Sequence, residues 1–285
     1  AVAAQAGPGT DPLHVLQVAL ARAGVSDPAL LDASDDERLA RVVVVAAQAP
    51  TLLAAAHRAA HGLPPVAPDP AAGHVADWLR MTTGSADPHA VRALETYLVA
   101  TIDHGSNAST FAARVVASTG ASVSSSVLAA IGAFLGPLHG GAPSRALAAI
   151  LELEPDAAAA WVRATLERGE RVMGFGHAVY RTRDPRSELL REVVRSFDDP
   201  LVARAMALEE RIEAALAEER PGRELHANVE FYAGLLMHLV GLPPTAFTAT
   251  FSVARVAGWG AHVLEQAALG RIIRPSLRYV ERPTS

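Results

Sequence analysis

Four polar stretches interrupt a chain of Ala- and Leu-rich segments, and each holds a side chain that can exchange protons. The candidates are His104 in "IDHGSNASTF" (102–111), His139 in "GPLHGGAPSR" (136–145), His177 in "GFGHAVYRTRDPR" (174–186) and Glu230 in "NVEFYAG" (228–234). Imidazole and carboxylate groups are common general acids and bases, and loops carry chemistry more often than helix interiors do. A lone His in a helical protein is usually a structural residue, so it is the set of four that indicates an active site.

The turn around His139 is more elaborate than packing requires. "FLGPLHGGAPSR" (134–145) places three Gly, two Pro and one His between two segments that have helical patterns. Gly and Pro at these positions predict a rigid turn that holds His139 at the start of the next helix.

Structural interpretations of single residues stay open on local evidence. Arg186 and Arg255 also fit solvent-exposed charges on helices. Glu230 also fits a first-turn acid that completes a helix start. His57 and His61 have the i, i+4 spacing of zinc ligands, but no "HExxH" motif and no obvious third ligand accompany them, so no metal site is predicted.

Composition excludes several classes of chemistry. The 285-residue chain has 25 basic and 30 acidic residues and a net charge of −5, and every basic residue is Arg. The absence of Lys excludes Schiff-base, pyridoxal-phosphate and Walker lysines. The absence of Cys excludes thiol nucleophiles and Cys-based zinc sites. No basic block is present, so nucleic acid is not an expected partner.

The chain is predicted to be all-α. Half of the residues are hydrophobic and 5% are aromatic, and period-2 strand patterns are almost missing. Asp11-Pro12 and "DASDDER" (32–38) predict the first two helix starts, with Pro50 breaking or kinking the second helix. Later helices are predicted near 74–82, 87–104, up to 120, up to 136, 143–153, 155–168, 187–196, 200–219, 228–240 and 245–269, before an extended basic tail.

Neither a membrane span nor a targeting segment is predicted. The charge-free run from Phe231 to Ala254 is broken by "GLPP" (241–244) and fits two buried helices. The first ten residues lack the features of a signal peptide, so a cytoplasmic location is expected. Trp78 and Trp259 lie on apolar helices and are predicted core residues.

Five motifs together resemble the citrate synthase family, in the order and approximate spacing that the family shows. They are "DHGSNASTFAARVVAST", "GPLHGGA", "GFGHAVYRTRDPR", "NVEFYAG" and "ARVAGWGAHVLEQ…RIIRP". The similarity covers the chain from about Asp11 to Tyr279, and the five motifs are specific only as a set. The resemblance implies a two-lobed helical fold, with a large domain (1–140 and 250–285) and a small domain (141–249) that carries part of the active site.

The resemblance also implies the catalytic residues. His139 corresponds to the donor that polarises the thioester oxygen of the acyl-CoA, and the positive end of a helix dipole is expected to keep its imidazole neutral. His177 corresponds to the donor to the oxaloacetate ketone. Glu230 stands where the family usually has an Asp base. The CoA thioester is a substrate, and no cofactor or metal is implied.

The binding residues are implied in the same way. Oxaloacetate has two carboxylates, and Arg suits their bidentate recognition. The residues implied for oxaloacetate are His104, Arg186, Arg255 and Arg274, and those implied for the CoA phosphates are Arg181 and Arg223. In the family the arginine near the C-terminus reaches the neighbouring subunit's site, so a homodimer is expected.

The implied reaction condenses a short acyl-CoA, with acetyl-CoA expected, and oxaloacetate to citrate and free CoA, as in the tricarboxylic acid cycle. A 2-methylcitrate synthase that uses propionyl-CoA remains open, because one methylene changes discrimination by only about 1–3 kcal/mol. A citryl-CoA lyase also remains open, because lyases related to this family are short as well. From another class, a non-catalytic paralogue that partners a full-length synthase also remains open.

The chain departs from the family pattern in three places. Glu230 replaces Asp, which moves the carboxylate by about 1 Å, and a displacement of that size can cost about 10²-fold in rate. "GGAPS" replaces "GGANE", and Pro143 suits a first helical position. Typical relatives have an additional N-terminal segment and a longer C-terminal tail, so a more open pocket, completion by another chain or a shortened paralogue is expected.

Overall fold

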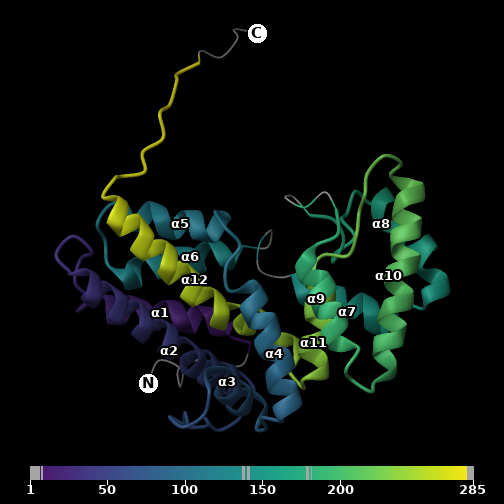
Figure 1. Ribbon diagram of the computed structural model, residues 1–285, viewed down its shortest axis with the longest axis horizontal. Helices are drawn as coiled ribbons and strands as arrows, with labels where there is room; N and C mark the ends of the chain where they lie inside the picture. Colours follow the sequence, from purple (N-terminus) through teal and green to yellow (C-terminus); the bar gives the residue numbers. More distant parts are fainter. Residues whose placement is uncertain are drawn as a thin grey trace.

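The computed structural model describes residues 7, 9–136, 139, 142–177, 180 and 182–280, except for the side chain of Ala142. Within these residues the chain forms twelve α-helices and no β-strand (Figure 1), which confirms the all-α prediction. In chain order the helices are α1 (Pro12–Gly24), α2 (Asp35–Ala60), α3 (His74–Thr83), α4 (Pro88–Thr101), α5 (Ala108–Ala117), α6 (Val123–Phe134), α7 (Ala142–Glu152), α8 (Ala158–Glu167), α9 (Pro185–Val194), α10 (Pro200–Glu219), α11 (Val229–Leu239) and α12 (Phe247–Leu269).

The helix starts follow the capping signals in the sequence. The Asp11 carboxylate accepts the backbone N–H of Leu13 at the start of α1. Ser34 and Glu37 form a capping box at the start of α2. Pro50 was predicted to break or kink the second helix. It does not break the helix, because α2 continues through it from residue 35 to 60. Pro50 is buried, so tertiary packing offsets the backbone hydrogen bond that proline cannot make.

Two groups of helices lie at the two ends of the molecule (Figure 1). In one group α1 packs on α2 and α6, α5 packs on α6, and α12 crosses α2, α5 and α4. In the other group α11 packs on α7 and α9, and α10 packs on α8 and α7. Helix α4 also packs on α9 and α11 and therefore joins the groups. The predicted division into domains of residues 1–140 with 250–285 and of residues 141–249 stays a prediction.

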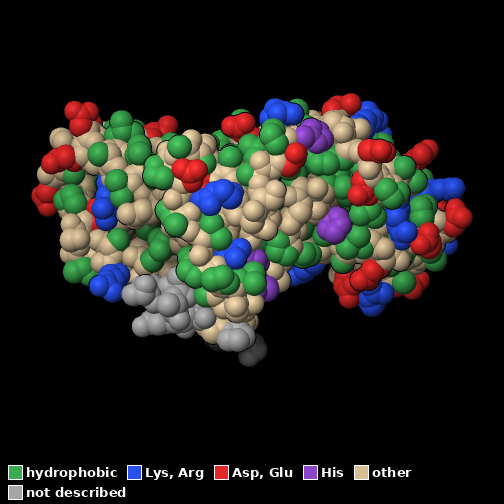
Figure 2. Space-filling model, turned by 90° about the horizontal axis from the view of Figure 1, so that it is seen from below, with side chains coloured by type: hydrophobic (Ala, Val, Ile, Leu, Met, Phe, Trp, Pro, Cys, Tyr) green, Lys and Arg blue, Asp and Glu red, His purple; other side chains and the backbone are tan. Residues whose placement is uncertain are grey.

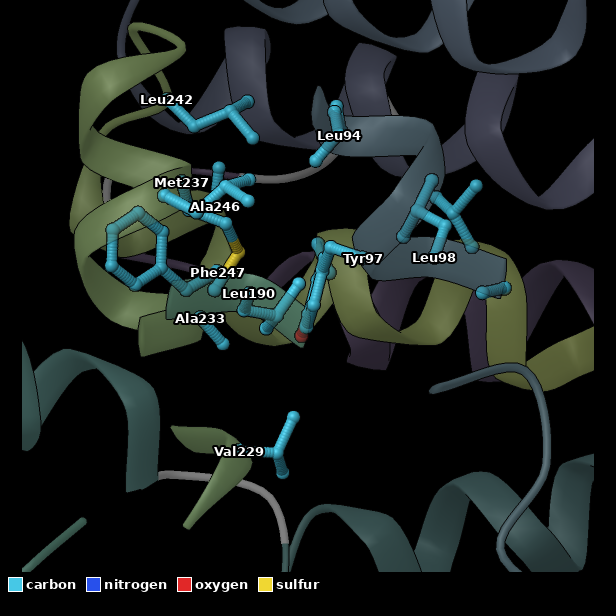
Figure 3. Packing of buried hydrophobic residues seen from close by; sticks show 14 of the residues in the cluster. Leu94, Tyr97, Leu98, Leu190, Val229, Ala233, Met237, Leu242, Ala246 and Phe247 are labelled. Atoms are coloured by element: carbon cyan, nitrogen blue, oxygen red, sulfur yellow. The ribbon is translucent and has the colours of Figure 1, made fainter. Parts of the chain in front are cut away.

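The hydrophobic core continues through the junction between the two groups. Figure 3 shows Leu94, Tyr97 and Leu98 of α4 beside residues of α9, α11 and α12. Trp78 and Trp259 are both fully buried, which confirms them as core residues. Seen from below (Figure 2), Arg side chains and acidic side chains are interspersed on the end of the molecule that contains α10.

Two glycines allow the close contacts that position the candidate site. A Cβ atom at Gly258 of α12 would lie 2.0 Å from the carbonyl oxygen of Ile102, just after α4. A Cβ atom at Gly234 of α11 would lie 2.5 Å from the carbonyl oxygen of Pro143 in α7. Backbone atoms cannot move away from such a contact cheaply, so only Gly fits at either place.

Among the described helices, α2 alone has the length and apolar composition that could cross a membrane. The same properties occur in the core helices of globular proteins. Its buried residues, among them Val45, Ala49 and Leu53, belong to the hydrophobic core that α2 shares with α1, α3 and α12.

Candidate active site

Six of the nine predicted site residues line one cavity of about 130 Å³ at the junction between the two helix groups. They are His104, His139, His177, Arg186, Glu230 and Arg255. The cavity is formed by the C-terminal end of α4, the N-terminal ends of α9 and α11, the middle of α12 and the loops around residues 104, 139 and 177. The four polar stretches that interrupt the helices in the sequence therefore meet in space.

Arg255 is a buried cation in this cavity. It is 2% exposed, so it is not one of the surface charges that local evidence left open. Its Nε donates to the carbonyl oxygen of Thr101 over 2.9 Å, and its guanidinium carbon lies 4.6 Å from the centre of the Phe251 ring. No carboxylate of the described residues forms an ion pair with it, and burial lowers the pKa of Arg255 to about 10. A buried guanidinium in this state is suited to an anionic ligand.

Arg186 differs because it already has an acidic partner. Its Nε and one terminal nitrogen donate to the two carboxylate oxygens of Asp184 over 3.0 and 2.8 Å. Asp184 is 2% exposed, caps α9 and also accepts the backbone N–H of Val229, next to Glu230. Hydrogen bonds from Arg186 hold the pKa of Asp184 below its usual range even though burial acts in the opposite direction. Asp184 thus fixes both Arg186 and the start of α11.

The two histidines of the loops lie side by side. The rings of His104 and His177 are 5.3 Å apart, centre to centre. The backbone N–H of Tyr180 lies 3.0 Å from Nδ1 of His177. A backbone N–H can only donate, so this Nδ1 accepts. The Nε2 of His177 lies 3.3 Å from a terminal nitrogen of Arg186, which also can only donate, so both ring nitrogens face donors and these contacts do not assign one tautomer. Burial and the charge of Arg186 lower the pKa of both imidazoles.

His139 lies in a turn three residues before α7, and its backbone N–H donates to the carbonyl of Gly136. Its Nε2 lies 2.9 Å from the Ser109 hydroxyl, which also receives the indole N–H of Trp259 over 3.1 Å. Burial, and after it the Arg255 guanidinium, lower the pKa of His139. Burial is therefore the main cause of the lowered pKa of His139, and the effect of the helix dipole that the sequence suggested stays a prediction.

Glu230 stands at the second position of α11, behind the cap residue Asn228. Asn228 accepts the backbone N–H of Glu230 and donates through its side-chain amide to the carbonyl of Gly176, the residue before His177. Burial raises the pKa of Glu230 from 4.5 to about 7, although Arg186 lowers it. A carboxylate with a pKa near 7 is well suited to general-base catalysis.

Two other predicted residues, Arg223 and Arg274, do not line this cavity. Arg223 lines a neighbouring cavity of about 440 Å³ together with Arg171 and Arg220. Arg274 is exposed in the tail after α12, and Arg181 lies outside the described residues. A third cavity, of about 740 Å³, opens from His139 and Glu230 toward α8.

Three residues of the site, Asp184, Ser109 and Tyr97, were not predicted from the sequence. Asp184 had a signal, because an Asp-Pro pair is a typical helix start. Tyr97 had none, since it stands inside a predicted helix, and Ser109 lies in the polar stretch 102–111, where nothing local distinguishes it. Tyr97 lines the cavity and Ser109 contacts His139.

The family model described as "Citrate synthase, C-terminal domain" matches residues 1–276. A Mycobacterium tuberculosis protein provisionally named citrate synthase 2 is 46% identical over 198 residues, which are 69% of this chain and 53% of that protein. The chain thus spans about half the length of that relative.

Two further relatives cover almost the whole chain. The 2-methylcitrate synthase of Mycobacterium tuberculosis is 36% identical over 270 residues, which are 94% of this chain and 68% of that enzyme. The citrate synthase of Thermoplasma acidophilum, solved as a ternary complex with carboxymethyl coenzyme A and oxaloacetate, superimposes with a TM-score of 0.86. It is 26% identical, and the match covers 97% of this chain and 74% of that one.

Proposed function

The chain belongs to the citrate synthase family, and we propose that it condenses acetyl-CoA with oxaloacetate to give citrate and free CoA. The CoA thioester is then a substrate, and no further cofactor is part of the proposal. A cytoplasmic location is part of it, and the lack of cysteine agrees with a reducing compartment.

In this proposal the keto acid binds first to the cationic side of the cavity. Arg255 and Arg186 hold its two carboxylates with His104, and the Nε2–H of His177 donates to its ketone oxygen. The support is the convergence of these four residues on one cavity. A donor on the ketone oxygen stabilises the negative charge that develops there as the new bond forms.

Glu230 and His139 act on the thioester. The Glu230 carboxylate takes a proton from the acetyl methyl group while His139 donates to the thioester oxygen, which gives an enol. The enol carbon attacks the ketone carbon, and His177 passes a proton to the ketone oxygen, which becomes the hydroxyl of citryl-CoA. Water then cleaves the thioester and releases CoA. Arg223 and Arg181 are proposed to bind the CoA phosphates.

One observation carries the proposal. The buried guanidinium of Arg255, which has no acidic partner among the described residues, shares a cavity with a carboxyl group whose pKa is raised to about 7. A dianionic substrate neutralises the cation, and the carboxyl group has the proton affinity that C–H abstraction requires.

Release of CoA tests this function directly. The chain has no Cys, so a thiol reagent detects only the thiol that the reaction liberates. We expect release with acetyl-CoA plus oxaloacetate and not with either alone, and a rate about 10²- to 10³-fold lower in His139→Ala, the usual effect of removing one donor to an oxyanion. No release with acetyl- or propionyl-CoA, combined with normal assembly of His139→Ala, would instead support the non-catalytic paralogue.

Propionyl-CoA is a second candidate substrate. The observation that favours it is the 2-methylcitrate synthase that matches 94% of the chain. The ratio of kcat/KM for the two thioesters in the same assay decides between them.

We also propose that the protein is a homodimer. Apolar side chains are exposed on adjacent helices α1 and α2, among them Val18, Leu39 and Val43 at 51–57% exposure. Beside them, α1 and α6 line a groove of about 340 Å³ that contains no charged residue. A second copy would cover such a surface.

Light scattering tests the dimer. We expect a mass of twice the 29.8 kDa of the chain, and a shift toward the single-chain mass for Val43→Glu, because a carboxylate buried at an interface lacks a partner. The matched change Val99→Glu, on an exposed residue of α4, should leave the mass unchanged. A single-chain mass for the unmodified protein contradicts the proposal.

A further inference from the structure

Tyr97 is a buried residue of α4 that also lines the candidate active-site cavity. It is 1% exposed and packs in the core beside Leu94 and Leu98. In Figure 3 its hydroxyl oxygen points away from these leucines, toward the side on which Ala233 and Val229 lie. Those two residues line the same cavity, so the ring belongs to the core and the hydroxyl belongs to the cavity.

The surroundings of Tyr97 place its hydroxyl near the buried cation. Tyr97 and Thr101 are one turn apart on α4, and Phe251 and Arg255 are one turn apart on α12. The rings of Tyr97 and Phe251 lie 6.4 Å apart, and Arg255 donates to the carbonyl of Thr101 over 2.9 Å. The two helices therefore present the phenol and the guanidinium to one cavity.

Burial keeps the hydroxyl of Tyr97 a hydrogen-bond donor. Burial raises the pKa of Tyr97 well above its ordinary value, and the nearby charge of Arg255, which acts in the opposite direction, does not cancel this effect. The phenol is therefore protonated at neutral pH.

A carboxylate bound at Arg255 needs more donors than Arg255 can supply. A carboxylate has two oxygens and about four acceptor positions. The Nε of Arg255 is already used by Thr101, which leaves its two terminal nitrogens. Arg186 also spends part of its fork on Asp184. A neutral O–H group beside the guanidinium is suited to fill one of the remaining acceptor positions.

We propose that Tyr97 is a substrate-binding residue whose hydroxyl donates a hydrogen bond to the oxaloacetate carboxylate that Arg255 holds. This inference rests on the proposed function, because oxaloacetate is the ligand that the function assigns to the cavity. It adds to that function a donor from α4, a helix that contributes no other proposed substrate contact.

Calorimetric titration of the full chain with oxaloacetate alone tests the contact, because it requires no turnover. Tyr97→Phe keeps the ring and removes only the hydroxyl. We expect the Kd for oxaloacetate to rise about 10- to 100-fold, as for loss of a hydrogen bond to a charged group. In the CoA-release assay the KM for acetyl-CoA should stay within about twofold.

Tyr232→Phe is the matched control. Tyr232 is also fully buried, but its hydroxyl donates to Glu209 over 2.6 Å and the residue does not line the cavity. This change should lower the melting temperature and leave the Kd for oxaloacetate within about twofold.

The outcomes separate the inference from the function. If the unmodified chain binds oxaloacetate and Tyr97→Phe binds it equally well, the hydroxyl is only a core group and the inference is wrong while the function stands. If the unmodified chain does not bind oxaloacetate, the proposed function fails and the contact fails with it. Equal weakening by Tyr97→Phe and Tyr232→Phe also overturns the inference, because the effect then comes from packing.

Discussion

Replacement of Glu230 by Gln is expected to slow CoA release by about 10²- to 10⁴-fold, the usual contribution of a general base. Gln has nearly the same size and can keep the contacts of the side chain, but it cannot take a proton from the acetyl group. The Kd for oxaloacetate should change only a few-fold, because the cationic residues remain. Initial rates at saturating concentrations of both substrates measure the first effect, and calorimetry measures the second.

The pH dependence gives an independent check on the same residue. Burial raises the pKa of Glu230 to about 7, and only the ionised form accepts a proton. The kcat/KM should therefore rise about tenfold per pH unit below 7 and level off above it. Because the pKa of Glu230 is higher in the folded state than in the unfolded state, its protonated carboxyl group favours folding at pH below 4.5. This contribution is lost as the pH rises to 7 and the carboxyl group ionises. The melting temperature of Glu230→Gln, relative to the unmodified chain, should therefore increase over that range.

Glu209→Gln is the control for Glu230→Gln. Glu209 is 3% exposed, burial also raises its pKa, and it accepts the hydroxyl of Tyr232 outside the cavity. Its replacement should reduce stability and leave the pH midpoint of kcat/KM in place. If Glu209→Gln also abolishes the pH midpoint of kcat/KM, then Glu230 is not the base. The same conclusion follows if Glu230→Gln keeps near-normal turnover.

Local signals in the sequence predicted the helix starts because caps depend on contacts within one turn. Asp11 and Ser34 each cap a helix at the expected place. Pro50 shows the limit of the same reasoning. Its effect depends on the helices that pack around α2, and no local pattern reveals them.

In the candidate site, too, local features were predictable and features that depend on the fold were not. The motifs identified the residues that line the cavity, since each motif carries its own reactive side chain. The burial that lowers the pKa of His139, and the smaller effect of Arg255, could not be predicted, because both arise only when segments distant in sequence come together in the fold. Tyr97 resembled an ordinary core residue of an apolar helix, and only the packing of α4 beside α12 shows which of its atoms face the cavity.

The second large effect is expected at Arg255, where function and stability should move in opposite directions. Arg255→Met should weaken oxaloacetate binding by about 30- to 1000-fold, the range for loss of one partner of a buried charge pair. The same change should raise the melting temperature of the substrate-free chain by about 2 °C. Calorimetric titration and a thermal melt of the same preparation measure the two effects.

The expected gain in stability follows from the cost of the unpaired charge. Burial lowers the pKa of Arg255 from 12.5 to about 10, so the folded state disfavours the protonated form at every pH below 10. The difference corresponds to about 3 kcal/mol at about 1.4 kcal/mol per pH unit. Loss of the hydrogen bond to Thr101 and of the contact with Phe251 offsets about 1 kcal/mol each. About 1 kcal/mol of stabilisation remains, which is worth about 2 °C in a chain of this size.

Arg114→Met is the matched control, because Arg114 is similarly shielded but has partners. Its side chain is 16% exposed and bonds to Glu265, His262 and Gln266. Its loss should lower the melting temperature and leave oxaloacetate binding within a few-fold. Replacement of a residue that binds substrate at the expense of stability raises the melting temperature, whereas replacement of a structural residue lowers it. If Arg255→Met lowers the melting temperature as Arg114→Met does and binding is unchanged, the guanidinium serves the fold and the cavity does not bind a dianion.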